Sequence, residues 1–309
     1  MRPGGRHPHR RAGSARRRHD RPRRPRGDRV SGPRWTPCGL ITLTTDFGTE
    51  DGYVGAMKGV MLSLAPDLRL HDLAHAIPPQ DLVRGAEALR AACPCFPAGT
   101  VHLVVVDPGV GGARRPVVAV AGAHAFVAPD NGILAPTLDA IAAPGDGPVA
   151  AWDIARHPFA RPTRSATFHG RDLFAPAAAA LAAGLASPCA LGPPVALSPS
   201  PAPLPQPAIE DEPAGATLAA SVAWADRFGN CVTNLPAATL AAFTGGAHAT
   251  VRLPGGRSIP IVRTYADVAP GEAAALVGSG GRLEIAVRDG SARETLGLSR
   301  GDRVALLRG

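Results

Sequence analysis

The sequence lacks any apolar run as long as a membrane span. A transmembrane helix needs about 18 or more consecutive apolar residues, and no segment of the 309 residues reaches that length. The arginine-rich start of the chain is also not followed by the apolar segment that a secretory or twin-arginine signal requires, which argues against both signals. Internal repeats are absent as well. We therefore expect neither a membrane protein nor a repeat protein.

Cysteine is scarce and shows no pairing pattern. The five cysteines are Cys38, Cys93, Cys95, Cys189 and Cys231, an odd number without any CxxC pair. The spacing of Cys93 and Cys95 is too tight for an ordinary zinc knuckle. We therefore expect reduced thiols in a cytoplasmic protein, and no metal site.

An excess of basic residues is missing from most of the chain, although the net charge is +8. Residues 1–34 hold 13 arginines against two acidic residues, whereas the rest holds 20 basic and 23 acidic residues. Residues 1–37 also have few apolar side chains and many prolines and glycines, which predicts a disordered tail. Such a tail could attract nucleic acid, but we favour a dispensable extension or a wrongly assigned start.

The region from 38 to 192 alternates between apolar strands and helices. Strands are predicted at 40–48, 68–74, 101–106, 116–122 and 126–134, and helices at 53–66, 81–96 and 173–186. Because the strands are apolar on both faces, they indicate an α/β domain with a largely parallel sheet flanked by helices.

A proline-rich segment follows this first domain. Eight prolines lie between Pro193 and Pro213, and such density disfavours both helix and central strand, which predicts a linker over 193–214. Beyond it, short strands are separated by glycine, asparagine and proline turns. This pattern predicts a smaller all-β domain of barrel or sandwich type over 215–309.

Polar residues gather at what should be the ends of apolar strands. Ligands of open α/β sheets bind beyond the carboxyl ends of the strands. One such segment alone is usually a turn, but four segments converging on one sheet predict a binding site. The residues are Asp46 in TTDFG, Asp107 and Arg114 in VVVDPGVGGARR, Asp130 and Asn131 in APDNG, and His169, Arg171 and Asp172 in SATFHGRD.

Two histidine-containing stretches call for different interpretations. His169 precedes a predicted helix, and Asp172 could orient it, so it is a candidate general base. The stretch HDLAH (71–75) is superficially like the HExxH zinc motif, which needs both histidines on one helical face. The alternation over 68–74 predicts a strand instead, so we predict no zinc site there.

Taken in order, the motifs resemble one family. TTDFG, DGYVGAMKG, HDLAH, DPGVGGARR, APDNG, TFHGRD, DRFGNCVTN and SGGRLEIAV are similar to those of the S-adenosyl-L-methionine hydroxide adenosyltransferases. These are adenosine-forming hydrolases related to the fluorinase and the chlorinase. The resemblance runs from about residue 40 to residue 307 with gaps only in the linker, and DPGVG followed by TFHGRD is its most specific part.

That resemblance implies hydrolysis of S-adenosyl-L-methionine to adenosine and L-methionine by in-line attack of water on C5′, without a cofactor. It also implies a homotrimer whose active sites lie between the N-terminal domain of one subunit and the C-terminal domain of its neighbour. The family's site residues match Asp107, Arg114 and His169 as the catalytic triad, Asp46 at the ribose, Asp226 and Asn230 at the amino-acid end, and Ser279 near that end and the adenine.

The chemistry fits these residue types. A sulfonium leaves as a neutral thioether, so neither an acid nor a metal is needed behind it, whereas water must be positioned and must lose a proton. Arg114 would stabilise a developing hydroxide but would weaken Asp107 as a base. We therefore expect Asp107 to orient the water and His169 to accept the proton, with a shared relay as an equal alternative.

Two other functions are weighed against hydrolysis. A halogenase must hold a halide, and the carboxylate of Asp107 stands where a halide-binding aromatic residue is expected and would repel the anion. A non-catalytic protein that binds S-adenosyl-L-methionine or adenosine would share the motifs but show no turnover. The lack of a GxGxG turn after the first strand disfavours a methyltransferase.

Overall fold

The computed structural model describes residues 35–141, 148–199, 204–212 and 215–308. The predicted tail, residues 1–37, therefore lies almost entirely outside the described residues. None of the described helices is both long enough and apolar enough to cross a membrane.

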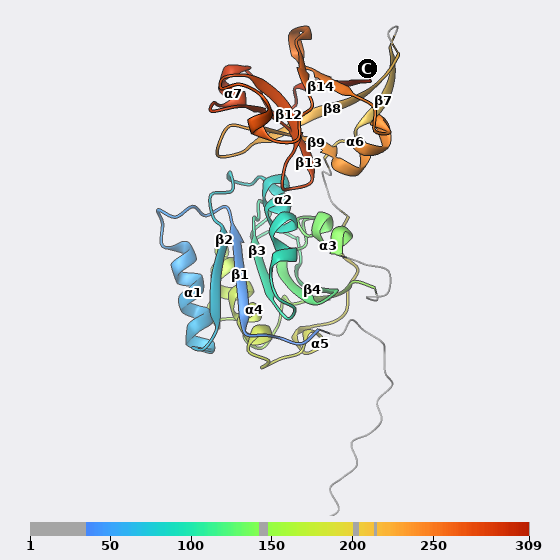
Figure 1. The fold of residues 1–309 in the computed structure, drawn as a ribbon. Coiled ribbons are helices and arrows are strands. Elements are labelled where there is room, and N and C mark those ends of the chain that lie inside the picture. Colours follow the sequence, from blue (N-terminus) through green and yellow to red (C-terminus); the bar gives the residue numbers. More distant parts are fainter. Residues whose placement is uncertain (1–34, 142–147, 200–203, 213–214, 309) are drawn as a thin grey trace, which may run out of the picture. The chain divides into compact units, whose positions relative to one another are not determined.

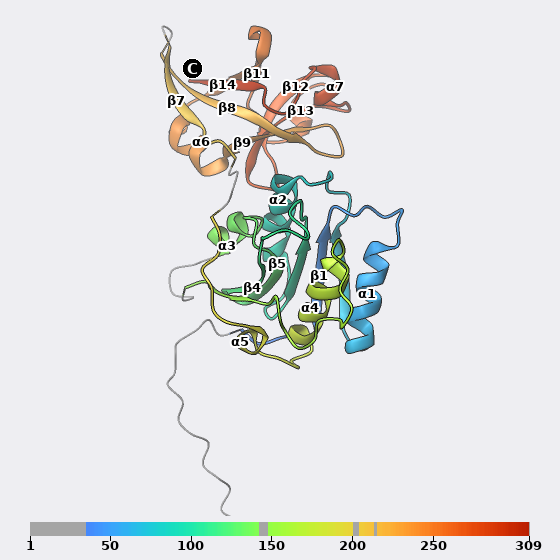
Figure 2. The same ribbon diagram turned by 180° about the vertical axis from the view of Figure 1, so that it is seen from behind.

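The N-terminal part is a sheet with helices on both faces (Figures 1 and 2). Its strands are β1 (Leu40–Thr45), β2 (Arg69–Ala74), β3 (Val101–Val105), β4 (Pro116–Ala121), β5 (His124–Pro129) and β6 (Ala150–Asp153). Its helices are α1 (Tyr53–Leu64), α2 (Leu82–Ala92), α3 (Ala135–Ile141), α4 (Ala175–Ala182) and α5 (Pro188–Leu191), with short turns η1 (Cys93–Cys95) and η2 (Gly170–Phe174).

The strand order is β2-β1-β3-β5-β4-β6. Strands β2, β1, β3 and β5 run parallel, whereas β4 and β6 are antiparallel to their neighbours. The largely parallel sheet is confirmed, but the antiparallel strands were not predicted. Only two residues separate β4 from β5, and a connection that short allows only a hairpin.

Each face of the sheet has its own apolar core. Along β3 and the residue after it, Leu103 and Val105 pack with α1 and α4, whereas Val104 and Val106 pack with α2 and α3. Figures 1 and 2 show α4 and the pair α2 and α3 on opposite faces. This two-sided burial explains why the strands read as uninterrupted apolar runs.

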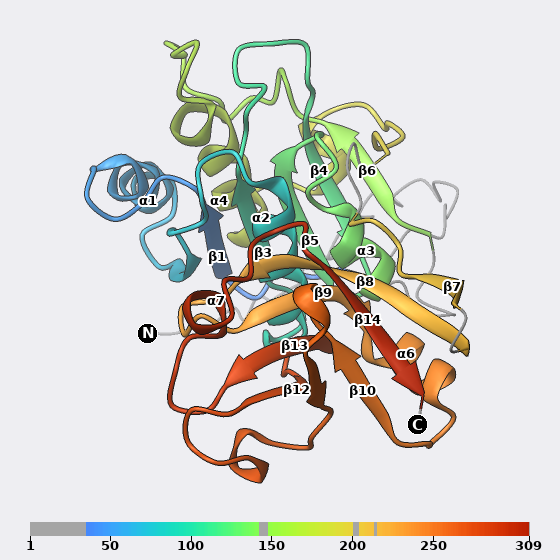
Figure 3. The ribbon, with the colours of Figure 1, turned by 90° about the horizontal axis from the view of Figure 1, so that it is seen from above.

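The C-terminal part is built mainly of strands (Figure 3). They are β7 (Ala208–Glu212), β8 (Gly215–Ala225), β9 (Cys231–Pro236), β10 (Ala249–Arg252), β11 (Ser258–Pro260), β12 (Ala273–Val277), β13 (Arg282–Val287) and β14 (Arg303–Arg308). The helices are α6 (Ala237–Thr244) and α7 (Ala292–Thr295), with turns η3 (Pro254–Gly256) and η4 (Tyr265–Asp267).

This second sheet is antiparallel and nearly closed. Its order is β11-β10-β14-β8-β9-β13-β12, and a bridge between Ile261 and Ala275 links the two ends of that order. The predicted β domain of barrel or sandwich type is confirmed, and the nearly closed sheet makes it barrel-like. Strand β7 lies inside the range predicted as linker and pairs with β8 outside the main order.

Candidate active site

Two neighbouring parallel strands end in carboxylates at the same edge of the first sheet. Asp46 follows β1 and Asp107 follows the buried Val106 at the end of β3. Because β1 and β3 run parallel and in register from Ile41 opposite Val101, both side chains emerge at the carboxyl edge, where ligands of such sheets bind.

A glycine turn returns the chain to Asp107. Gly111 has a φ of 77°, and a Cβ there would lie 2.9 Å from the carbonyl oxygen of Ala166. Any other residue would be strained in that conformation and would push the turn away from the segment before His169. The turn therefore brings Arg114 to Asp107 and holds both against residues 165–169.

Asp107, Arg114 and His169 form one hydrogen-bonded group. Nε of Arg114 donates to both carboxylate oxygens of Asp107 at 2.9 Å, and Nη2 also contacts Oδ2. The same Nη2 donates to Nδ1 of His169 at 2.8 Å. The side chains of Asp107 and Arg114 are only 5% and 9% exposed, so solvent screens this ion pair weakly.

The environment of His169 disfavours its protonated form. Burial lowers the pKa of His169, the charge of Arg114 lowers it further, and Asp107 opposes both effects. A guanidinium can only donate, so Nδ1 of His169 must accept and the neutral ring carries its proton on Nε2. His169 directly precedes η2, a π-helical turn of the kind often found at functional sites.

The expectation that Asp172 orients His169 is not what the structure shows. Among the described residues, the carboxylate of Asp172 pairs with Arg171 and Arg161 and accepts from the backbone N–H of Ser165. The Asp172 side chain is fully buried, and a buried carboxylate requires such partners. Its role is to fasten the segment before His169 to the start of η2.

A pocket of about 310 Å³ lies over this edge of the sheet, and Asp46, Asp107 and His169 line it. Oδ2 of Asp46 accepts from the backbone N–H of Gln80 at 2.8 Å. Asp130 and Asn131 are occupied elsewhere, since Asp130 pairs with Arg115 and the Asn131 amide donates to the carbonyl of Val106.

Three aromatic side chains complete this pocket and were not predicted. Phe47, Tyr53 and Phe168 line it, with ring centroids between 5.2 and 6.0 Å apart and rings tilted or edge to face. The signal was available, because aromatic residues make up only 4% of the sequence and these three stand inside or beside the polar motifs.

A chain of polar contacts fixes the end of β1 next to Asp46. Nδ1 of His75 lies 2.8 Å from Oγ1 of Thr45, and Nε2 of His75 lies 2.9 Å from Oδ1 of Asp72. Lys58, the single lysine of the sequence, donates to Oδ2 of Asp72 at 2.6 Å. The HDLAH stretch thus begins in β2, which confirms the predicted strand, and its side chains brace the Asp46 turn.

The residues predicted at the amino-acid end lie in the second domain and do not line this pocket. Asp226 accepts from the backbone N–H groups of Phe228 and Asn230 and from the Asn230 amide, so these contacts hold its own turn together. Asp226 and Ser279 line a separate pocket of about 310 Å³. Glu284 lines it too, accepts from the Tyr265 hydroxyl, and has its pKa raised mainly by burial.

We predict that the pKa of His169, measured by NMR titration of its ring, lies below the ordinary histidine value of about 6.5. Arg114→Gln raises it, because the substitution removes a neighbouring positive charge. Arg115→Gln serves as the matched control, since Arg115 pairs with Asp130, and leaves the pKa unchanged. An unchanged or lower pKa in Arg114→Gln would contradict this account.

Comparison with known proteins assigns most of both domains to one family. The N-terminal domain model of the SAM hydroxide adenosyltransferases matches residues 41–192, and the C-terminal domain model of the same family matches residues 220–305. An (R)-S-adenosyl-L-methionine hydrolase from Thermus thermophilus is 45% identical over 275 residues, covering 86% of this chain and 99% of the relative.

A solved structure and a more distant relative agree with this assignment. The crystal structure of an uncharacterized conserved protein from Thermotoga maritima superposes with a TM-score of 0.77 at 31% identity, covering 87% of this chain and 100% of that one. A fluorinase from Actinoplanes is 27% identical over 168 residues, covering 47% of this chain and 55% of its own length. The chain belongs to the SAM hydroxide adenosyltransferase family.

Proposed function

We propose that this protein hydrolyses S-adenosyl-L-methionine to adenosine and L-methionine, and that it takes the (R) epimer at sulfur. The main support is the hydrogen-bonded group of Asp107, Arg114 and His169 beside a pocket of suitable size. Family membership and the 45% identity to an (R)-S-adenosyl-L-methionine hydrolase give independent support.

In the proposed reaction, a water oxygen attacks C5′ as the bond from C5′ to sulfur breaks, and the electron pair of that bond leaves with methionine. No acid is needed at sulfur because the leaving group is neutral. The contribution of the protein is to hold the water in line, which can lower the barrier by about 7–11 kcal/mol in ideal cases.

Asp107 is suited to orient the water. Three contacts from Arg114 hold the carboxylate in one plane, and a carboxylate offers about four acceptor positions, so one is left for a water hydrogen. The guanidinium of Arg114 stays charged at any working pH, so its ion pair holds the Asp107 carboxylate in this orientation throughout.

His169 is suited to accept the proton, although its pKa is lowered. Attack by water gives a protonated alcohol, which is a far stronger acid than an imidazolium, so even a weak base removes its proton. Accepting at Nδ1 requires His169 to release its hydrogen bond to Arg114, and Arg114 stays paired with Asp107. The proton therefore moves to the neutral member of the group, while the ion pair persists.

The remaining pocket residues match the parts of a nucleoside. Asp46 presents a carboxylate that can accept hydrogen bonds from two neighbouring ribose hydroxyls. Phe47, Tyr53 and Phe168 give the same pocket an aromatic wall, which suits the apolar faces of the sugar and base.

The amino-acid end of the substrate carries an ammonium group that requires a partner. We propose that this end is bound by Asp226, Asn230 and Ser279. Asp226 and Ser279 line a different pocket from Asp107 and His169. We therefore propose a homotrimer in which the first pocket of one subunit faces the second pocket of its neighbour. Such heterologous contacts close into a ring of three.

Halogenation is disfavoured for a physical reason. The carboxylate of Asp107 is 5% exposed and lines the pocket, and a buried carboxylate repels a halide stripped of its water. A cytoplasmic location is proposed with the hydrolase activity, and the five free cysteines, all in described residues, are consistent with it.

Product analysis in ¹⁸O-labelled water tests the reaction. We expect adenosine with the label in its 5′-hydroxyl, and a loss of turnover of at least about 100-fold in Asp107→Ala because the water is no longer positioned. Asp67→Ala, an exposed carboxylate before β2, retains full activity as the control. Binding without turnover would indicate a sensor, and a 5′-halogenated product would indicate a halogenase.

The pH dependence of turnover tests the role of His169. Protonated His169 cannot accept a proton, so turnover falls as pH decreases through the pKa of His169, which lies below about 6.5. His169→Ala removes this acidic limb and leaves a lower rate, whereas His248→Ala, an exposed histidine, retains it. An acidic limb that persists unchanged in His169→Ala would assign the proton to another group.

Mixing two inactive variants tests the shared active site. Asp107→Asn and Asp226→Asn chains, each inactive alone, form mixed trimers in which about a quarter of the sites combine two intact halves. We expect about that fraction of wild-type activity after co-expression, with the mass of three chains in solution. Mixed trimers without recovered activity would mean that both halves come from one chain.

A further inference from the structure

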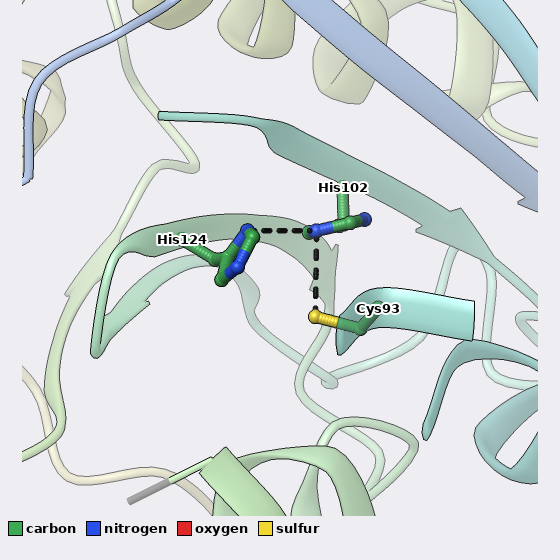
Figure 4. A group of neighbouring side chains, drawn as sticks. All are labelled: Cys93, His102 and His124. Carbon is green, nitrogen blue, oxygen red and sulfur yellow. Dashed lines mark hydrogen bonds between the residues drawn. The ribbon is translucent and has the colours of Figure 1, made fainter. Parts of the chain in front are cut away.

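A second group of reactive side chains lies away from the pocket, where the strands of the first sheet begin. His102 is the second residue of β3, His124 is the first residue of β5, and Cys93 is the first residue of η1, directly after α2. Because β3 and β5 run parallel and α2 leads back toward their starts, three separate segments meet there (Figure 4).

The donor atoms of these side chains converge on one point. Nε2 of His102 lies 3.5 Å from Sγ of Cys93 and 3.2 Å from Nδ1 of His124, and all three donor atoms lie within 4.8 Å of one another. A tetrahedral zinc ion, bound at about 2.3 Å to sulfur and 2.0–2.1 Å to nitrogen, separates sulfur from nitrogen by about 3.5 Å and two nitrogens by about 3.3 Å. Two of the three separations thus already suit one ion.

Hydrogen bonding alone does not account for both contacts of His102. A neutral imidazole nitrogen carries either one proton or one lone pair. Nε2 of His102 can therefore form a full hydrogen bond with only one of its two neighbours, Sγ of Cys93 or Nδ1 of His124. The remaining contact is at best a shared hydrogen bond.

The surroundings of His102 are those of a metal ligand. Its other nitrogen, Nδ1, lies 2.7 Å from Oγ1 of Thr42 on the neighbouring strand β1, and such a partner fixes which ring nitrogen is left to bind a metal. Phe126 stacks on the His102 ring at 5.2 Å and Phe96 packs edge-on at 5.8 Å. His102 is fully buried, whereas His124 is partly exposed and gives a route of entry.

We propose that Cys93, His102 and His124 bind one zinc ion, with a water molecule as the fourth ligand. The step is a ligand exchange without oxidation or reduction: the Cys93 thiol gives its proton to solvent, its sulfur binds zinc as a thiolate, and both imidazoles bind as neutral donors. The soft sulfur and the two imidazoles favour zinc over magnesium or calcium.

This site is separate from the proposed chemistry. His102 and Asp107 are five residues apart on one extended strand, which corresponds to roughly 16 Å. A bound ion would join the end of α2 to the starts of β3 and β5, so its role is structural. No metal was expected from the sequence, because the three ligands form no spaced motif and only the parallel pairing of β3 with β5 brings the histidines together.

Cobalt titration of the full chain, stripped of metal with a chelator, tests the site. We expect a thiolate-to-cobalt charge-transfer band that saturates at one equivalent of Co²⁺ and disappears on adding Zn²⁺, together with a higher melting temperature in zinc. Cys93→Ser loses the band and the zinc-dependent rise, and Thr42→Val weakens Co²⁺ binding by about 10–100-fold.

Matched controls keep the test decisive. Cys231→Ser removes another buried thiol and Cys95→Ser removes the thiol two residues away, and both should retain the band. His124→Ala, at a partly exposed position, replaces Cys93→Ser if that variant does not fold, and should also lose the band. A wild-type protein without the band, or a band that survives both Cys93→Ser and His124→Ala, would show that the group is only a hydrogen-bonded cluster.

Discussion

The contact of one guanidinium with two acceptors organises the whole candidate active site. Arg114 pairs with Asp107 through both Nε and Nη2 and donates to His169 through Nη2. A buried arginine without a carboxylate, or a buried carboxylate without an arginine, would be costly. Together they fix the plane of the Asp107 carboxylate, and the charge of Arg114 also contributes to the lowered pKa of His169.

The backbone makes this contact available through two local departures from regular structure. Gly111 adopts a left-handed conformation against the carbonyl of Ala166, and η2 begins directly after His169 with a π-helical turn. Asp172, a buried residue of that turn, fastens residues 161–165 to it. Positions 107, 114 and 169 therefore meet because a strand end, a glycine turn and an irregular helix start are each held by separate contacts.

Much of this could be predicted from the sequence, and the limits have physical causes. Apolar runs that end in Asp46 and Asp107 predicted buried parallel strands with polar residues at their carboxyl ends. The prediction holds because β1 and β3 run in the same direction, which brings both ends to one edge of the sheet. The pattern does not reveal strand direction, so the strand β4 was predicted without its antiparallel orientation, and β6 was not predicted at all. It also does not reveal partner choice, so Asp172 was assigned to His169 although neighbouring arginines compete for it.

The two ends of β3 show how one strand can carry two kinds of polar site. At its end, Asp107 leaves the sheet and meets a pocket lined by charged, hydrogen-bonding and aromatic side chains. Near its start, His102 stays inside the core, stacked on Phe126 and bonded to Thr42. A buried imidazole needs a hydrogen-bond partner for each nitrogen, and for His102 these partners come from other segments of the chain, β1, β5 and η1. That is why the Asp107 site could be found from a motif, whereas the surroundings of His102 became visible only in three dimensions.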